Sequence, residues 1–220
     1  MKESLLLACL LMTFPVLADV MTDVGDVQKS WAEANYQLKD KAQKEAFEDL
    51  MTRAETMVQA NPASAEALIW RGIVSSTYAG VKGGLGALSL AKSAKADFEQ
   101  ALKTDDKALN GSAYTSLGTL YFKVPGWPIA FGDSDKAEEL LKKALTMNPN
   151  GIDSNYFYGV FLQEQRDYED AERYLLKAQQ APARPDRPLA DQGRQQEISK
   201  ALEQVRYQLK AKQQHAGFIN

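Results

Sequence analysis

Three stretches of the chain repeat one short pattern of small and large apolar residues. Each has an alanine, a large apolar residue four positions later and a second alanine three positions after that. Spacings of four and three place all three side chains on one face of an α-helix. The alanines let a neighbouring helix approach, and the large side chain fills the groove between the helices. The chain is therefore predicted to consist of packed helices. The three copies are Ala94, Phe98 and Ala101; Ala137, Leu141 and Ala144; and Ala171, Leu175 and Ala178.

A glycine lies before each copy, at Gly72, Gly118 and Gly159, and the middle copy has further matching residues around it. These residues resemble the signature of the tetratricopeptide repeat, a helix pair of about 34 residues. The match covers about residues 64–185. The resemblance implies an all-α fold in which antiparallel helix pairs stack into a right-handed solenoid. In the middle copy, the signature positions are Tyr114, Leu117, Gly118, Tyr121, Ala137, Ala144 and Pro149.

Both ends of the array are predicted to be capped by amphipathic helices. A polar outer face on the terminal helix keeps a repeat array soluble, and Arg194 is expected on that face. The apolar stripe of this last helix contains Ile198, Leu202, Val205 and Leu209. The predicted organisation is a signal peptide at 1–18 and one helical domain at 19–220. Within the domain we expect a degenerate repeat at 22–62, repeats at about 64–106, 111–149 and 152–185, and a capping helix at 190–213.

Two of the repeats carry insertions between their helices. Gly159 and Ala171 are twelve residues apart, as in the family, but the corresponding separations in the first two copies are twenty-two and nineteen. The inserted stretches, Gly80–Gly86 and Val124–Asp133, are rich in glycine and proline and are predicted to be loops. Asp133 or Ser134 then caps the helix that comes next. Loops at equivalent places in successive repeats emerge on one edge, so the two insertions are expected to be neighbours.

The first residues are typical of an export signal. Lys2 is followed by an apolar run, and small residues precede Ala18 as a signal peptidase requires. Cleavage there would leave Asp19 as the first residue and place the protein in the periplasm. The alternative is a lipoprotein, because Cys9 ends a short lipoprotein-like motif. The apolar run is shorter than the roughly 20 residues of a membrane span.

Composition excludes several classes of function. Cys9 is the only cysteine and His215 the only histidine, so neither a zinc site nor a Cys–His or Ser–His catalytic pair is expected. None of the usual catalytic motifs is present. The net charge of -3 gives no basic surface for nucleic acid. The sequence therefore predicts a protein that is not an enzyme, with no metal, no cofactor and no catalytic residues.

Candidate binding residues lie in the second insertion and on the first helix of each pair. Trp127 stands between two prolines in the insertion, with Phe131 close by. An aromatic side chain on a loop is often a binding anchor, but Trp127 could also fold back and cover the core. In the family, the first helices line the concave groove. The resemblance places Leu68, Ile73, Ser76 and Thr77 there, then Thr115, Thr119, Phe122 and Lys123, then Tyr156, Val160, Gln163 and Glu164.

These residues predict a groove that is apolar with hydroxyl groups. The family's clamp for peptide carboxylates uses lysine and asparagine, and Lys123 is the one basic residue at these positions. We therefore expect a scaffold that binds a protein or peptide, or a small amphipathic ligand, through the groove and the edge loops. The alternative is a ligand-binding accessory subunit of a tripartite ATP-independent transport system in the periplasm, by fold analogy. An exposed aromatic rim favours the scaffold and an enclosed cavity the accessory subunit.

The export signal gives the first prediction. Because the small-residue site ends at Ala18, N-terminal sequencing of the protein from its native host should begin at Asp19. A lipidated Cys9 as first residue would indicate a lipoprotein instead, and an intact Met1 would contradict both interpretations.

Overall fold

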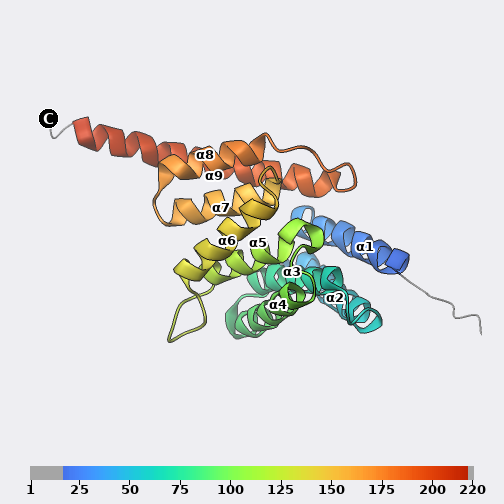
Figure 1. Cartoon of the computed structure of the whole chain (residues 1–220). Helices are drawn as coiled ribbons and strands as arrows, with labels where there is room; N and C mark the ends of the chain where they lie inside the picture. Colours follow the sequence, from blue (N-terminus) through green and yellow to red (C-terminus); the bar gives the residue numbers. More distant parts are fainter. Residues whose placement is uncertain (1–16, 218–220) are drawn as a thin grey trace, which may run out of the picture.

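The computed structural model describes residues 17–217, and helices form most of this part of the chain (Figure 1). Except for its last two residues, the predicted signal peptide lies outside the described residues, as does Cys9. The helices are α1 (Leu17–Tyr36), α2 (Asp40–Ala60), α3 (Ala65–Lys82), α4 (Gly84–Thr104), α5 (Ala108–Lys123), α6 (Ser134–Met147), α7 (Ile152–Glu164), α8 (Tyr168–Gln179) and α9 (Pro188–Gly217).

Consecutive helices pack as pairs, α1 with α2, α3 with α4, α5 with α6 and α7 with α8. The first helix of each pair also packs against the first helix of the next, so that α1, α3, α5 and α7 form an inner layer. The second helices lie outside them. This arrangement confirms the predicted all-α fold of stacked helix pairs, in which each pair buries its apolar face against its neighbours.

The repeated sequence pattern forms the same contact in three of these pairs. All nine residues of the three copies are 0% exposed. A Cβ atom added to the glycine of the inner helix would overlap the large side chain of the outer helix, so a side chain here would push the two helices apart. The added Cβ would lie 2.5 Å from the Phe98 ring at Gly72, 2.8 Å from Leu141 Cγ at Gly118, and 2.9 Å from Leu175 Cγ at Gly159.

The loop predicted over Gly80–Gly86 is wrong. Helix α3 continues to Lys82 and α4 begins at Gly84, so the insertion lengthens both helices instead. Gly83 and Gly84 have φ angles of +63° and +62°, a left-handed conformation that glycine adopts without steric cost. Two glycines are thus enough to reverse the chain, and the packing of α3 on α4 outweighs the low helix propensity of the others.

The second insertion forms the predicted loop between α5 and α6. Main-chain hydrogen bonds hold its base together: the Gly132 amide donates to the Pro125 carbonyl at 2.9 Å, and the Asp133 amide donates to the Tyr121 carbonyl at 3.0 Å. The Asp133 carboxylate accepts from the Lys136 amide at 3.0 Å and caps α6, as predicted. The loop therefore projects from the array on a fixed base (Figure 1).

The C-terminal helix does more than cap the array. Helix α9 packs on α7 and α8 and also reaches back to α1, so the inner layer closes on itself (Figure 1). An added Cβ on Gly193 would lie 2.4 Å from the Tyr36 ring, which shows how closely α9 crosses α1. Ile198 and Val205 are fully buried as the stripe predicted. Arg194 is also buried and not on the outer polar face, because it makes ion pairs inside this crossing.

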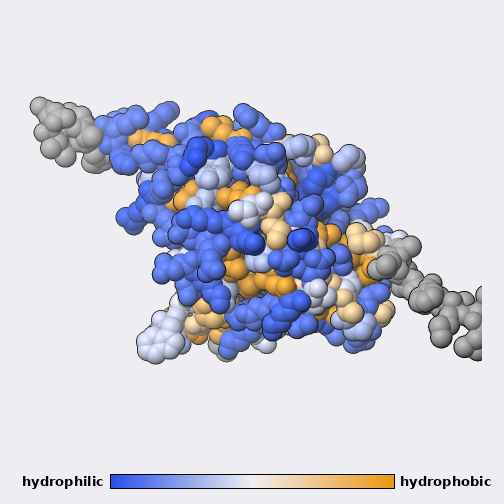
Figure 2. Space-filling view, viewed as in Figure 1, coloured by the Kyte–Doolittle hydropathy of each residue, from blue (hydrophilic) through white to orange (hydrophobic). Residues whose placement is uncertain are grey.

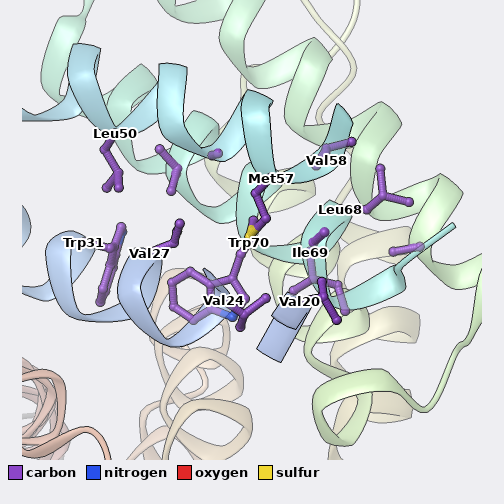
Figure 3. Packing of buried hydrophobic residues seen from close by; sticks show 14 of the residues in the cluster. Val20, Val24, Val27, Trp31, Leu50, Met57, Val58, Leu68, Ile69 and Trp70 are labelled. Atoms are coloured by element: carbon purple, nitrogen blue, oxygen red, sulfur yellow. The ribbon is translucent and has the colours of Figure 1, made fainter. Parts of the chain in front are cut away.

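The hydrophobic core has two parts, one around α1–α3 and one around α4–α9. In the first, Trp70 of α3 lies beside Val24 of α1 and Met57 of α2 (Figure 3). The rings of Trp31 and Trp70 meet edge to face, with centroids 6.0 Å apart. The degenerate first repeat is thus joined to the array by aromatic packing rather than by the glycine contact of the other repeats.

The glycine contact gives a prediction about stability. Replacing Gly118 with leucine should lower the free energy of unfolding by about 1–3 kcal/mol, because the new side chain overpacks the contact with Leu141. Gly25→Leu on α1 is the matched control, since nothing lies within 4 Å of an added Cβ there. Urea unfolding of both variants would measure the difference. Equal stability of Gly118→Leu and the parent would contradict the contact.

Candidate functional site

The closed inner layer surrounds a cavity of about 240 Å³, which we call the inner cavity. Residues from α1, α3, α5, α7 and α9 line it, together with Arg187 from the segment between α8 and α9. Aromatic rings and hydroxyl groups make up most of its wall, and a charged group lies at one end. The lining residues are Trp31, Trp70, Ile73, Ser76, Thr77, Ser112, Thr115, Ser116, Thr119, Leu120, Lys123, Asp153, Phe157, Arg187 and Arg194.

Hydrogen bonds fix several groups of this wall. The Trp31 indole N–H donates to Thr77 Oγ1 at 3.0 Å, and Thr77 in turn donates to the Ile73 carbonyl at 2.8 Å. On α5, Thr119 Oγ1 donates to the Thr115 carbonyl at 2.8 Å. The hydroxyl donors of Thr77 and Thr119 are thus turned toward their own helices. Their oxygens keep lone pairs that can accept hydrogen bonds from a ligand.

The charged end of the inner cavity is built around Asp153 at the start of α7. One carboxylate oxygen accepts from Arg194 Nε at 2.8 Å, and the other accepts from Arg184 Nη1 at 2.6 Å. Arg184 also pairs with Asp191 at 2.6 Å, and Arg194 pairs with Glu197. The cluster joins α7, α9 and the segment between α8 and α9, so it holds α9 where it closes the inner layer.

The environment of this cluster shifts the pKa values of its members. Burial alone would raise the pKa of Asp153, but the charges of Arg194, Arg184 and Arg187 together outweigh it and hold that pKa well below its ordinary value. Burial alone would lower the pKa of Arg194, but Asp153, Tyr36 and Glu197 together outweigh burial and raise it. Burial raises the pKa of the neighbouring Tyr36 hydroxyl to about 12. At neutral pH the cluster therefore holds ionised pairs beside a neutral phenol.

A second cavity of about 560 Å³ adjoins the inner cavity, and we call it the neighbouring cavity. The two cavities share Trp70, Ser112, Thr115, Asp153 and Arg187 as lining residues. The side of the neighbouring cavity away from these residues is formed by α1, by the turn before α7 and by the segment between α8 and α9. Together the two cavities reach the size at which proteins enclose small organic ligands.

A third cavity, of about 500 Å³, lies at the edge of the array, and we call it the edge cavity. The turn between α3 and α4 forms one side, and the loop between α5 and α6 forms the other. This confirms that the two insertions are neighbours. Ser76, Leu120 and Lys123 line both the inner and the edge cavity, so the two adjoin. The remaining lining is mostly apolar: Ala79, Gly80, Gly84, Ala87, Leu88, Ala91, Val124, Pro125, Ile129 and Ala130.

Two large apolar side chains stand out from the loop beside the edge cavity. Trp127 is 90% exposed and Ile129 is 71% exposed. Trp127 does not fold back over the core, so the alternative prediction that this side chain covers the core is wrong. Phe131 holds the loop instead, because its ring packs edge to face on Tyr121 with centroids 5.7 Å apart. We call Trp127, Ile129 and the edge cavity together the edge surface.

The structure brings some of the predicted groove residues to the inner cavity and places others elsewhere. Thr115, Thr119 and Lys123 line it. Lys123 is already paired with Glu164. Phe122 packs on Phe161, with ring centroids 5.6 Å apart, and lies half-buried.

The predicted residues on α7 lie outside the inner cavity. The guanidinium carbon of Arg194 lies over the Tyr156 ring, 4.5 Å from the centroid of that ring. Gln163 Nε2 donates to Gln204 Oε1 of α9 at 3.0 Å, and Val160 is half-buried in the second part of the core. Helix α9 thus covers two positions that an open groove would expose, because it runs along α7 after meeting α1 near its own beginning.

Sequence reasoning missed the charged end of the inner cavity. Arg184 and Arg187 lie in the proline-rich segment after α8, and Arg194 was assigned to an outer face. The family pattern has no positions for them, because they lie beyond the last repeat. The available signal was a pair of arginines spaced three apart in a short proline-rich segment. Only the crossing of α9 over α1 brings this segment to the inner cavity.

Residues 17–217 hold neither a metal-binding cluster nor a membrane-spanning helix. No group of three or more histidine, cysteine, aspartate or glutamate side chains in this range is arranged to hold a metal ion. In the same part of the chain, no helix has the length and apolar character needed to cross a bilayer. The face of the molecule shown in Figure 2 is mostly hydrophilic and carries several separate hydrophobic patches.

Comparison with known proteins gives a family match to part of the chain and several distant structural likenesses, of which three are described. A family model described as tetratricopeptide repeat matches residues 129–196. No curated protein matches the sequence. One crystal structure of MamA has 18% sequence identity and a TM-score of 0.43, over 80% of this chain and 99% of that one. Another crystal structure of MamA has 17% sequence identity and a TM-score of 0.44, over 90% of this chain and 96% of that one. The structure of pilF from Pseudomonas aeruginosa has 15% sequence identity and a TM-score of 0.35, over 86% of this chain and 92% of that one.

The Asp153 cluster gives a prediction about pH. Asp153→Asn should lower the free energy of unfolding at pH 7 by about 3 kcal/mol, because it leaves the buried Arg194 and the half-buried Arg184 short of a carboxylate. The folded-state pKa of Asp153 lies below the ordinary value of 3.8. The unfolded chain therefore takes up the proton first, and this contribution is lost as the pH falls below about 4.

Urea unfolding at several pH values between neutral and strongly acid would measure the effect. The stability difference between parent and Asp153→Asn should narrow as the pH falls. Asp49→Asn, at an exposed position on α2, should show no such narrowing. A difference that stays constant with pH would mean that the carboxylate charge of Asp153 does not hold α9.

Proposed function

We propose that the chain is a periplasmic scaffold of the tetratricopeptide-repeat type that binds a protein or peptide partner, since a tetratricopeptide-repeat model matches residues 129–196. The single observation that carries this proposal is the edge surface. It combines two exposed apolar side chains, Trp127 and Ile129, with an apolar cavity beside them. Repeat arrays act by presenting such surfaces on a rigid frame.

The physics of the edge surface supports a binding role. A tryptophan left 90% exposed loses most of the free energy that its burial would supply. The loop that carries it is anchored by main-chain hydrogen bonds and by Phe131, so little conformational entropy remains to be lost when a partner binds. Rigid, exposed aromatic side chains are the usual centres of protein–protein binding energy.

The edge cavity defines what the partner would supply. Its walls are alanine, glycine, proline, valine and leucine, so an apolar side chain of the partner would fit into it. Lys123 at its inner border is paired with Glu164 and offers no free charge. The partner is therefore a protein or peptide that inserts an apolar residue beside Trp127, with a polar periphery around it.

The cellular location is part of the proposal and rests on the amino-terminal sequence. An apolar run followed by small residues before Asp19 supports export. The described helices begin at Leu17, so removal of the first eighteen residues would leave α1 almost complete. The scaffold would then act in the periplasm.

The inner cavity favours a second function. Its aromatic and hydroxyl wall, continued by the neighbouring cavity, suits a small amphipathic ligand. The corresponding role is that of a ligand-binding accessory subunit of a periplasmic transport system of the tripartite ATP-independent type. The edge surface remains the stronger observation, because exposed apolar side chains call for a partner that covers them.

The edge surface gives a prediction about binding. Trp127→Ala should weaken partner binding by about 2 kcal/mol or more, since it removes the central anchor. The melting temperature should stay unchanged, because the side chain contributes little to the core. Tyr207→Ala is the matched control, as Tyr207 on α9 is 70% exposed. Partners would be identified by a photo-crosslinking residue placed at 127, with the same residue at 207 as control, and their affinities then measured.

Two results would contradict this proposal. A large fall in melting temperature for Trp127→Ala would make Trp127 a structural residue. A partner captured equally from positions 127 and 207, and bound equally by both alanine variants, would remove the loop from the binding site.

A further inference from the structure

Arg187 differs from the two arginines beside it. Arg184 and Arg194 each pair with two carboxylates, whereas the guanidinium of Arg187 makes no hydrogen bond or ion pair with any residue in the described part of the chain. Its Nε atom is buried and has no partner. Arg187 instead lies over the ring of Trp70, 5.0 Å from the centroid. It lines both the inner and the neighbouring cavity.

The carboxylates whose charges act on Arg187, those of Asp153 and Asp191, make their hydrogen bonds with other arginines. Both oxygens of Asp153 accept from Arg184 and Arg194, and both oxygens of Asp191 accept from Arg184. Burial, and then the charge of Arg184, lowers the pKa of Arg187. An arginine stays protonated all the same. The protein thus keeps a half-buried cation at a cavity wall, and its buried Nε–H has no acceptor, which is costly unless a partner arrives.

A second donor without a partner lies on the ring that Arg187 covers. Trp70 Nε1 is buried and bonded to nothing in residues 17–217. Trp70 and Arg187 therefore form one stacked unit that has unused donors and borders both cavities. Two orphaned donors at one place indicate a site completed by an acceptor that the chain does not supply.

We propose that the cavities beside Arg187 bind a small organic monocarboxylate. Its charged end lies at the guanidinium of Arg187, and its apolar body lies along Trp31, Trp70 and Phe157. The planar fork of an arginine matches a carboxylate with two parallel hydrogen bonds. The inference is independent of the edge surface, since a partner there would leave Arg187 uncovered.

The charge of the cluster favours one negative charge over two. Three arginines and the three carboxylates of Asp153, Asp191 and Glu197 balance formally. A monoanion then adds a single charge beside Asp153, whereas a phosphate dianion would add two at a short distance from that carboxylate. The rings and hydroxyl oxygens of the wall suit an apolar body with a few donors.

The test compares acids with their neutral amides. Isothermal titration calorimetry of the whole protein would use phenylacetate and hexanoate as probes, with phenylacetamide and hexanamide as controls at equal ionic strength. An acid should bind at least about tenfold more tightly than its amide, as for hydrogen bonds to a charged group. Arg187→Gln should remove this preference. Arg173→Gln, at an exposed position on α8, should keep it.

Melting temperatures guard against a folding defect. Arg187→Gln removes a cation that makes no ion pair, although it also removes the contact with the Trp70 ring, so it should still unfold in one cooperative transition. Phenylacetate should raise the melting temperature of the parent alone. Arg187→Lys keeps the charge without the fork and should retain a weakened preference for the acid. Equal binding of acid and amide, no binding of either acid, or undiminished binding by Arg187→Gln would overturn the proposal. Tighter binding of inorganic phosphate, or of a peptide with a free carboxyl end, would also overturn it.

Discussion

The contact between a glycine on one helix and a large apolar side chain on its partner sets the geometry of the array. At Gly118 and Leu141 the two helices approach so closely that no side chain fits between them. Because the same contact recurs at Gly72 and Gly159, the helix pairs have a common shape and stack with their first helices together. The inner layer, and every cavity that it lines, results from this repeated approach.

Closure of that layer by α9 turns a groove into a cavity. Gly193 lets α9 cross α1 against the Tyr36 ring, and the ion pairs of Asp153 hold the crossing in place. The same crossing covers Tyr156 and brings Arg187 to the cavity wall. The edge surface is built differently, from a loop that projects beyond the array and keeps Trp127 in solvent. The molecule thus offers one site lined by the inner layer and one at the edge of the array on a single frame.

The two insertions show where the local sequence predicts a loop correctly and where it does not. The loop at Val124–Asp133 could be predicted because Pro125 and Pro128 cannot continue a helix, and Asp133 is a strong helix cap. The loop predicted at Gly80–Gly86 failed because glycine only weakens a helix, and packing between α3 and α4 supplies more free energy than the glycines remove. That the two insertions meet could be predicted from repeat geometry alone.

The sequence by itself determined the helices, their pairing and the buried face of each, because periodic small and large residues have few other ways to be buried. It also placed Thr115, Thr119 and Lys123 at the inner cavity. Only the tertiary structure decided that Trp127 stays exposed and that Arg187 lacks a partner. The reason is physical: exposure and ion pairing depend on which distant segments meet. The crossing of α9 over α1 joins residues more than 150 positions apart, as Tyr36 and Gly193 show.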